Sequence, residues 1–236
     1  MASRMISTLW HQLLDMLMPR LCVACGRRLG WSEQTLCASC LMHLSRTGFQ
    51  HSPLDNKMAR LFWGVVPVER AAALFYYEAH SKTSQIIYDL KYHDRPDIGV
   101  MMGRLAAREF EASGFFSGID LIVPMPLARN RQRQRGYNQS RQLAEGLSRA
   151  TGIPLCSRAV SRSVFRKSQT TMGRWDRQAN VEGVFALADA DALRGRHVLL
   201  VDDVVTTGAT MTACARELLK AGDVTISLFA LGFAKS

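Results

Sequence analysis

The sequence predicts an α/β protein, in which a doubly wound parallel sheet follows a small N-terminal metal-binding module. Short apolar segments alternate with segments of helical periodicity after residue 60, the pattern of strands that helices bury on both faces. The preceding segment instead holds two Cys-x-x-Cys pairs, a spacing typical of a structural metal site. We therefore place the module at residues 1–60 and the sheet domain at residues 61–236.

The first predicted element is an amphipathic helix over residues 1–21. Its apolar side chains recur at helical spacing, for example Ile6, Leu9 and Leu13, and such a face usually packs on its own domain. The cysteine segment follows at residues 22–40. Residues 50–68 are irregular because Pro and Gly interrupt them, so we place the domain boundary there.

The cysteine segment predicts a closed metal site. Its four candidate ligands are Cys22, Cys25, Cys37 and Cys40. Four thiolates bind structural Zn²⁺ in a tetrahedron, and an iron–sulfur cluster is the main alternative. Because four sulfurs complete the shell, we expect no catalysis at this metal. The sequence shows no signal-peptide pattern and no apolar run long enough for a bilayer, so we expect a cytoplasmic protein without membrane insertion, where metal is favoured over disulfides.

The sheet domain is predicted to contain four strands and four helices in alternation. The strands are expected at residues 71–77, 119–123, 197–201 and 224–231, and the helices at residues 82–92, 101–113, 137–150 and 208–220. A helix after almost every strand favours parallel pairing.

The most specific motif follows the strand at residues 197–201. Asp202 and Asp203 come directly after it, and the turn Thr206-Thr-Gly-Ala-Thr210 opens the next helix. Ligands of open α/β sheets bind at the carboxyl ends of strands, and free N–H groups at a helix start bind phosphate. Two carboxylates there would repel a bare anion, so we expect them to accept hydrogen bonds from ribose hydroxyls or to lie near a metal. An ATPase would need a Gly-Lys loop, and the sequence contains no Gly-Lys pair.

This stretch resembles the motif with which type I phosphoribosyltransferases bind 5-phosphoribosyl-1-pyrophosphate (PRPP). The resemblance implies a type I phosphoribosyltransferase-like sheet, with Asp202 and Asp203 as catalytic residues that contact ribose. It also implies that Mg²⁺ binds together with PRPP. The implied ligand-binding residues of the turn are Val204, Thr206, Thr207, Gly208, Ala209 and Thr210. Enzymes for 6-oxopurines usually carry a further Asp where this chain has Thr206, which weakens a purine-salvage role and leaves the acceptor open.

Basic residues gather between Arg129 and Arg177. Twelve Lys and Arg residues lie there against two acidic residues, a local excess of +10 that equals the net charge of the whole chain. Because Arg binds phosphate oxygens bidentately, we expect a loop in this segment to hold pyrophosphate. The candidate residues are Arg129, Arg131, Arg133 and Arg135. A solvated basic face is the alternative.

The same region resembles the ComF family, competence-associated relatives of the phosphoribosyltransferases. Val123-Pro-Met-Pro-Leu127 and Arg135-Gly-Tyr-Asn-Gln139 resemble its V-P-x-P-L and R-G-[FY]-N-Q signatures. Leu90-Lys91-Tyr92, a segment at residues 168–185 and the N-terminal cysteines match further parts of its pattern. The resemblance implies that Lys91, Arg174 and Arg177 also bind PRPP, the two arginines from a hood at residues 165–185.

The resemblance also implies a link to the uptake of transforming DNA. An alternative function is therefore a single-stranded nucleic-acid-binding accessory protein without transferase turnover. Grooves for single strands interleave aromatic rings with arginines, yet Tyr137 is the only aromatic residue between Arg129 and Arg149. On this contrast we favour PRPP as the ligand, although the protein could bind both PRPP and DNA. PRPP would be either turned over with release of pyrophosphate or only sensed.

Overall fold

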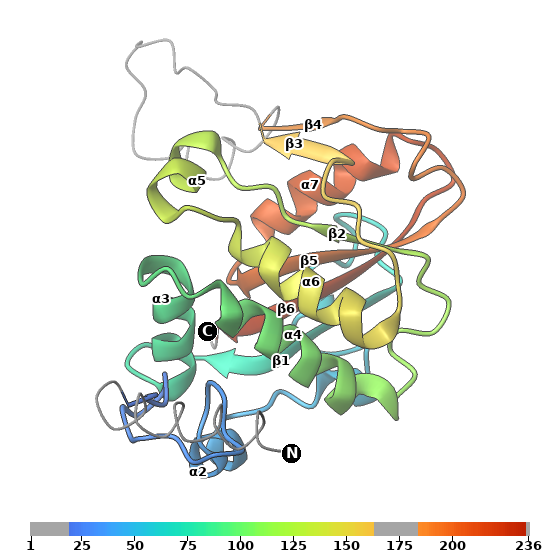
Figure 1. Cartoon of the computed structure of the whole chain (residues 1–236). Coiled ribbons are helices and arrows are strands. Elements are labelled where there is room, and N and C mark those ends of the chain that lie inside the picture. The colour runs from blue at the N-terminus through green and yellow to red at the C-terminus, as the bar shows by residue number, and fades with distance from the viewer. Residues whose placement is uncertain (1–18, 163–183, 235–236) are drawn as a thin grey trace, which may run out of the picture.

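The computed structural model describes residues 19–162 and 184–234. A four-stranded sheet lies at its centre, with the strand order β1-β6-β5-β2 and parallel pairing throughout. Its strands are β1 (Arg70–Tyr77), β2 (Leu121–Pro124), β5 (His197–Val205) and β6 (Thr225–Ala234). A separate antiparallel pair is formed by β3 (Val160–Arg162) and β4 (Phe185–Leu187) (Figure 1). The predicted α/β class and parallel sheet are confirmed.

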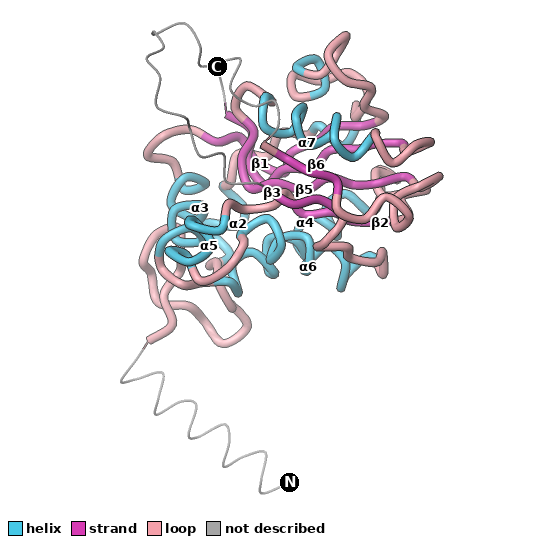
Figure 2. The backbone as a smooth tube through the Cα atoms, turned by 90° about the horizontal axis from the view of Figure 1, so that it is seen from above, coloured by secondary structure: helices cyan, strands magenta, loops and turns pink. Residues whose placement is uncertain are grey.

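Helices cover both faces of the sheet. The helices α4 (Pro96–Glu111) and α6 (Gln139–Thr151) lie on one face and α7 (Ala209–Leu219) on the other (Figure 2). The helix α3 (Lys82–Tyr92) follows β1 and packs against β1 and α4. Near the N-terminal end of the described chain lies α2 (Ala38–His43), and two 3₁₀ turns, η1 (Phe49–His51) and η2 (Ala59–Leu61), precede β1.

The central strands form the core because they are apolar along almost their whole length. Residues 198–201 of β5 are fully buried, and residues 226–233 of β6 are buried as well. Phe110 of α4 packs edge-on against Phe229 of β6 and against Phe115, with ring centroids 5.6 and 5.3 Å apart. Strands buried on both faces are typical of parallel sheets, because helices cover each side.

Glycines allow α4 and α6 to approach each other very closely. A Cβ atom at Gly103 would lie 2.2 Å from the carbonyl oxygen of Leu143, and one at Gly146 would lie 2.1 Å from that of Val100. No real Cβ tolerates such distances, so both positions require glycine at this helix spacing. The contact fixes α6 against the rest of the domain, and α6 carries part of the site described below.

Three predictions differ most from the structure. The helix expected at residue 101 begins at Pro96, since proline suits the first turn of a helix. The strand expected to end at Val201 continues to Val205, because its last residues stay paired with β6. The arginine-rich loop is wrong as a prediction, because Arg129–Arg135 forms the short helix α5; Arg and Gln are good helix formers. Residues 1–18 of the predicted first helix lie outside the described residues.

The irregular segment before β1 is attached to the sheet by main-chain hydrogen bonds. The amide of Thr47 donates to Leu74 and that of Tyr76 to Ser45. The side chain of Asn56 donates to the carbonyl of Ala71 and accepts from two amides of its own turn. The boundary after residue 60 stays a prediction. Among the described helices, none is long and apolar enough to cross a membrane.

Candidate functional site

The loop between β5 and α7 forms a small open cup. Gly208 occupies the left-handed region at φ +76°, and a Cβ atom there would lie 3.1 Å from the ring of Phe62. Thr206 and Thr207 are exposed. A cavity of about 30 Å³ is lined by Asp202 and residues 204–211. The N-cap residue Gly208 makes no side-chain cap bond, and the amide of Ala209 makes a long bond, of 3.5 Å, to the hydroxyl of Thr207. A helix start of this kind suits an anion, which amides and hydroxyls can bind together.

Asp202 and Asp203 lie at the carboxyl end of β5 in different environments. Asp202 accepts a hydrogen bond from the hydroxyl of Ser140, at 2.9 Å. Burial, together with the negative charge of Asp203, raises the pKa of Asp202 to about 7. Asp203 instead forms an ion pair with Lys91 of α3, with 3.0 Å between Nζ and Oδ2. Asp202 therefore gains or loses its proton near physiological pH, while its neighbour has a cationic partner.

The segment Arg135–Ser140 connects this acid pair to two other parts of the site, α3 and the end of β2. The hydroxyl of Tyr137 donates to the carbonyl of Leu90 at the end of α3. Asn138 caps α6 and also donates to Met125 just after β2. Ser140 holds Asp202. Sequence reasoning found this signature but gave Ser140 and Asn138 no role, because their partners lie far away in the chain.

The helix α5 places its arginines beside Lys91. A cavity of about 1010 Å³ is lined by residues of α5 and of the end of α3. From the predicted set, the structure brings Lys91, Arg131, Arg133 and Arg135 to this cavity, and Asp94 also lines it. Arg129 is exposed at the start of α5 and is not among the lining residues. The guanidinium of Arg135 stacks over Tyr92, 5.2 Å from its ring centroid.

Arg162 is a candidate that sequence reasoning missed. It lies on β3, half-buried, with its guanidinium 5.4 Å from the ring centroid of Phe185 on β4. Burial and the charge of Arg131 lower its pKa, while Asp202 acts in the opposite direction. Arg162 therefore lies within electrostatic reach of both the acid pair and α5. In the sequence, the only indication of a role for Arg162 is its position within the basic segment between Arg129 and Arg177. The predicted Arg174 and Arg177 lie outside the described residues.

The four predicted cysteine ligands lie together. Their sulfur atoms are all within 4.8 Å of one another, and those of Cys25 and Cys37 are 3.8 Å apart. A tetrahedral ion with metal–sulfur bonds of about 2.3 Å separates its sulfurs by about 3.8 Å. Of the four residues only Cys25 is exposed. The donor set therefore fits a structural metal ion.

Backbone amides support negative charge in this cluster. The amides of Cys37 and Cys40 donate to the sulfurs of Cys22 and Cys37, each at 3.4 Å. The bond from Cys40 lowers the pKa of Cys37 to about 6, whereas burial raises that of Cys40 to about 12. A bound cation would stabilise the remaining thiolates, because metal ligands are deprotonated.

Comparison with known proteins agrees with this geometry. The model of the phosphoribosyl transferase domain matches residues 134–232, which include α6, Arg162 and the β5–α7 loop. The DNA utilization protein YhgH of Shigella flexneri is 30% identical, covering 89% of each chain. Competence protein F of Haemophilus influenzae is 28% identical, over 90% of this chain and 84% of that one.

Among solved structures, the glutamine phosphoribosylpyrophosphate amidotransferase of Bacillus subtilis matches 60% of this chain and 30% of its own. Its TM-score is 0.40 and its identity 20%. The matches to YhgH and competence protein F extend over most of this chain. The phosphoribosyl transferase domain and the four-cysteine cluster agree with them. The chain belongs to the ComF family of competence-associated, phosphoribosyltransferase-like proteins.

Proposed function

We propose that the protein binds PRPP with Mg²⁺ at the carboxyl end of β5. The observation that carries this proposal is the acid pair beside the β5–α7 loop. Asp202 and Asp203 lie next to the start of α7, where Gly208 makes no side-chain cap bond. One ligand with adjacent hydroxyls and a terminal phosphate would therefore bind both the acid pair and the helix start. Carboxylate oxygens also suit Mg²⁺, which proteins usually bind through one or two carboxylates while the phosphates of the substrate provide further ligands.

The residues have separate tasks in this proposal. Asp202 and Asp203 accept hydrogen bonds from the ribose hydroxyls, while residues 206–210 bind the 5′-phosphate through amides and hydroxyls. Lys91, Arg162 and the arginines of α5 neutralise the pyrophosphate. Mg²⁺ supplies further charge neutralisation of the leaving group when it is bound.

Group transfer at such a site displaces pyrophosphate. The lone pair of an acceptor atom forms a bond to the anomeric carbon, and the bond from that carbon to the pyrophosphate oxygen breaks. Pyrophosphate leaves with the electron pair, and the proton that the acceptor loses passes to water. The positive charge that develops on ribose lies near Asp202 and Asp203, which would stabilise it electrostatically. Sensing of PRPP without turnover uses the same contacts.

Calorimetric titration of PRPP with and without Mg²⁺ tests the proposal. We expect micromolar, Mg²⁺-dependent binding to the wild-type protein and its loss in the double variant Asp202→Asn and Asp203→Asn. Full affinity in that variant would overturn the assignment. Release of pyrophosphate in the presence of candidate acceptors then separates turnover from sensing.

For the four-cysteine cluster we propose Zn²⁺ as the structural ion. The 3.8 Å separation of two sulfurs supports a tetrahedral ion with bonds of zinc–thiolate length. Metal analysis and absorbance separate zinc from the alternative, because an iron–sulfur cluster is coloured and contains iron and sulfide.

Binding of single-stranded DNA is a second candidate function, and one contact favours it. The sequence places only Tyr137 among the arginines of residues 129–149, but the structure adds a ring from α3, because Tyr92 lies under the guanidinium of Arg135. One ring therefore lies beside an arginine of α5, and grooves for single strands combine these two kinds of side chain. The names of the relatives, DNA utilization protein and competence protein F, point to a role in DNA uptake. A salt titration tests it, because phosphate contacts give a steep salt dependence. No measurable binding near physiological salt would end this candidate.

A further inference from the structure

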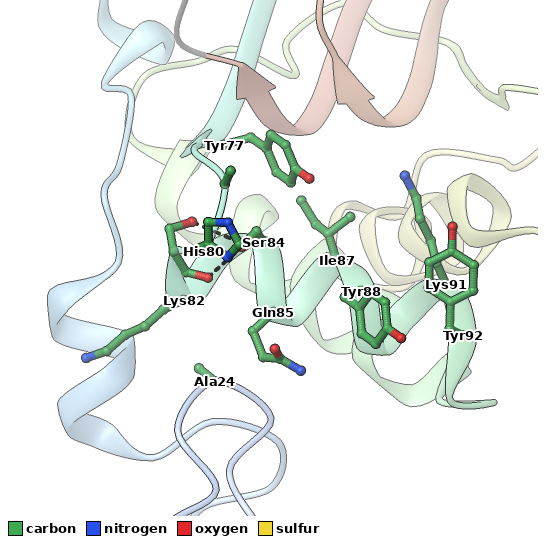
Figure 3. Close-up of a pocket in the computed structure, with 12 residues that line it drawn as sticks. Ala24, Tyr77, His80, Lys82, Ser84, Gln85, Ile87, Tyr88, Lys91 and Tyr92 are labelled. Atoms are coloured by element: carbon green, nitrogen blue, oxygen red, sulfur yellow. Dashed lines mark hydrogen bonds between the residues drawn. The ribbon is translucent and has the colours of Figure 1, made fainter.

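Two large cavities adjoin along the helix α3. The first has a volume of about 880 Å³ and is lined by residues 79–82, by one side of α3 and by Ala24 of the cysteine segment (Figure 3). The second is the cavity of about 1010 Å³ beside α5. Lys91 and Tyr92 line both cavities. The two therefore form one continuous surface, which is called the α3–α5 groove below.

The α3–α5 groove is strongly basic. Among the described residues that line it, five carry a positive charge and only Asp94 carries a negative one. The five cationic residues are Lys82, Lys91, Arg131, Arg133 and Arg135. Because lysine and arginine side chains bind phosphate oxygens, an excess of this size along one groove favours an extended polyanion as its ligand.

Tyrosine rings lie among these cations. Tyr88 and Tyr92 are one helical turn apart on α3, 50% and 58% exposed, with ring centroids 4.9 Å apart. Lys91 precedes Tyr92 on the same helix, and the guanidinium of Arg135 lies 5.2 Å from the ring centroid of Tyr92. A polyphosphate chain would need cations alone. Exposed rings among cations instead favour a single-stranded polynucleotide, whose bases stack on rings while its phosphates bind the cations.

The groove shares its cations with the proposed PRPP site. Lys91 lines both cavities and also pairs with Asp203 at 3.0 Å. Lys91 and the arginines of α5 are the groups that neutralise pyrophosphate in the proposed function. A strand and a pyrophosphate group that used these cations together would repel each other, because both are polyanions. The shared cations therefore allow one of the two ligands at a time.

We propose that a single-stranded polynucleotide binds along the α3–α5 groove and that the strand and Mg²⁺-PRPP exclude each other. The inference rests on the proposed binding of PRPP, and it assigns the second candidate function to a specific surface. Bases stack on Tyr88 and Tyr92, while backbone phosphates bind Lys82, Lys91 and the arginines of α5. PRPP releases the strand by occupying the shared cations. By thermodynamic linkage, the strand weakens the binding of PRPP by the same factor.

Fluorescence anisotropy with a labelled oligothymidylate of about 15 nucleotides, a length near common site sizes, tests the exclusion. Each ligand is first titrated alone into the metal-loaded full chain, and the strand is then titrated again with saturating Mg²⁺-PRPP. We expect PRPP to weaken strand binding about tenfold or more, and sulfate at equal ionic strength to have a much smaller effect. The double variant Asp202→Asn and Asp203→Asn should still bind the strand but no longer respond to PRPP.

A pair of variants tests the position of the strand. Tyr88→Ala removes a ring that has no part in the proposed PRPP contacts, so strand affinity should fall about tenfold while PRPP affinity stays constant. The matched control is Trp63→Ala. Trp63 is 56% exposed and also lies beside an arginine, 5.7 Å from Arg60, but it does not line the groove. Its loss should leave strand affinity unchanged.

A third variant guards against an effect on folding. Lys82→Gln changes an exposed side chain at the start of α3 and should lower the slope of strand affinity against salt by about one, with PRPP affinity unchanged.

The outcomes separate this inference from the proposed function, because each ligand is also titrated alone. Strand affinity that PRPP leaves unchanged would overturn the exclusion, and equal strand affinities of Tyr88→Ala and Trp63→Ala would overturn the assignment of the groove. A protein that binds PRPP but no strand overturns the inference and leaves the proposed function in place. Absence of PRPP binding overturns both.

Discussion

The cysteine cluster and the acid pair are two polar sites built in opposite ways. The cluster takes its four ligands from 19 consecutive residues, 22–40, and their sulfurs face one another within 4.8 Å. The acid pair has its partners, Lys91 and Ser140, on two helices far away in the chain, and it opens to solvent beside the β5–α7 loop. The first site is complete once a metal is bound, whereas the second is complete only when a ligand arrives.

The largest expected effect is a disruption of the cysteine cluster that leaves the acid pair intact. In Cys37→Ser, or after removal of the metal by a chelator, we expect loss of the metal and local unfolding of residues 19–45, because structural zinc contributes roughly 10 kcal/mol or more to folding. Metal analysis and hydrogen exchange measure this. PRPP affinity should change less than threefold, and its complete loss would show that the two sites are not independent.

A substitution at the glycine contact of α4 and α6 is expected to affect the acid pair strongly and to leave the cysteine cluster unchanged. Gly146→Ala places a Cβ atom 2.1 Å from a carbonyl oxygen, so we expect a loss of about 1–3 kcal/mol in the free energy of unfolding. Denaturant unfolding measures it. Because α6 carries Ser140, PRPP affinity should fall while metal content stays constant. The control Gly30→Ala meets its nearest atom at 3.5 Å and should be nearly neutral.

The pH dependence of stability sharpens the difference between the two carboxyl groups. The pKa of Asp202 is raised from 3.8 to about 7, so the folded state holds a proton that the unfolded state releases. The resulting stabilisation is fully present below about pH 4 and is lost as the pH rises through 7. The variant Asp202→Asn lacks this dependence, so its stability relative to the wild type should increase between pH 5 and pH 8. Thermal unfolding at both pH values measures the difference, and a constant difference would contradict the raised pKa.

The smallest expected effect comes from a substitution of Arg162, which lies near the acid pair. Arg162→Gln removes one cation near Asp202 and Arg131, and we expect PRPP affinity to fall about tenfold, the worth of one charge-assisted hydrogen bond. Arg104→Gln on α4 is the matched control, since Arg104 is exposed on a helix away from the loop. Equal affinities of the two variants would remove Arg162 from the site.

The two sites also differ in how well the sequence predicts them. The spacing of the cysteines is local, so it predicts which residues meet. The apolar strand with its acids and Gly208 predicts the position of the second site equally well. The sequence does not predict that Ser140 meets Asp202 or that Tyr92 meets Arg135, because those contacts depend on how α3, α5 and α6 pack. The arginines of α5 were expected in a loop, since charge alone does not distinguish a loop from a short helix.

The contacts of residues 137–140 have a consequence for chain length. Within four residues this segment bonds to Leu90 on α3, to Met125 after β2 and to Asp202 on β5. A substitution removes one of these contacts and leaves the others in place. An insertion or deletion of a single residue would move every later partner out of reach at once. Related chains should therefore keep the number of residues between Tyr137 and Ser140 constant.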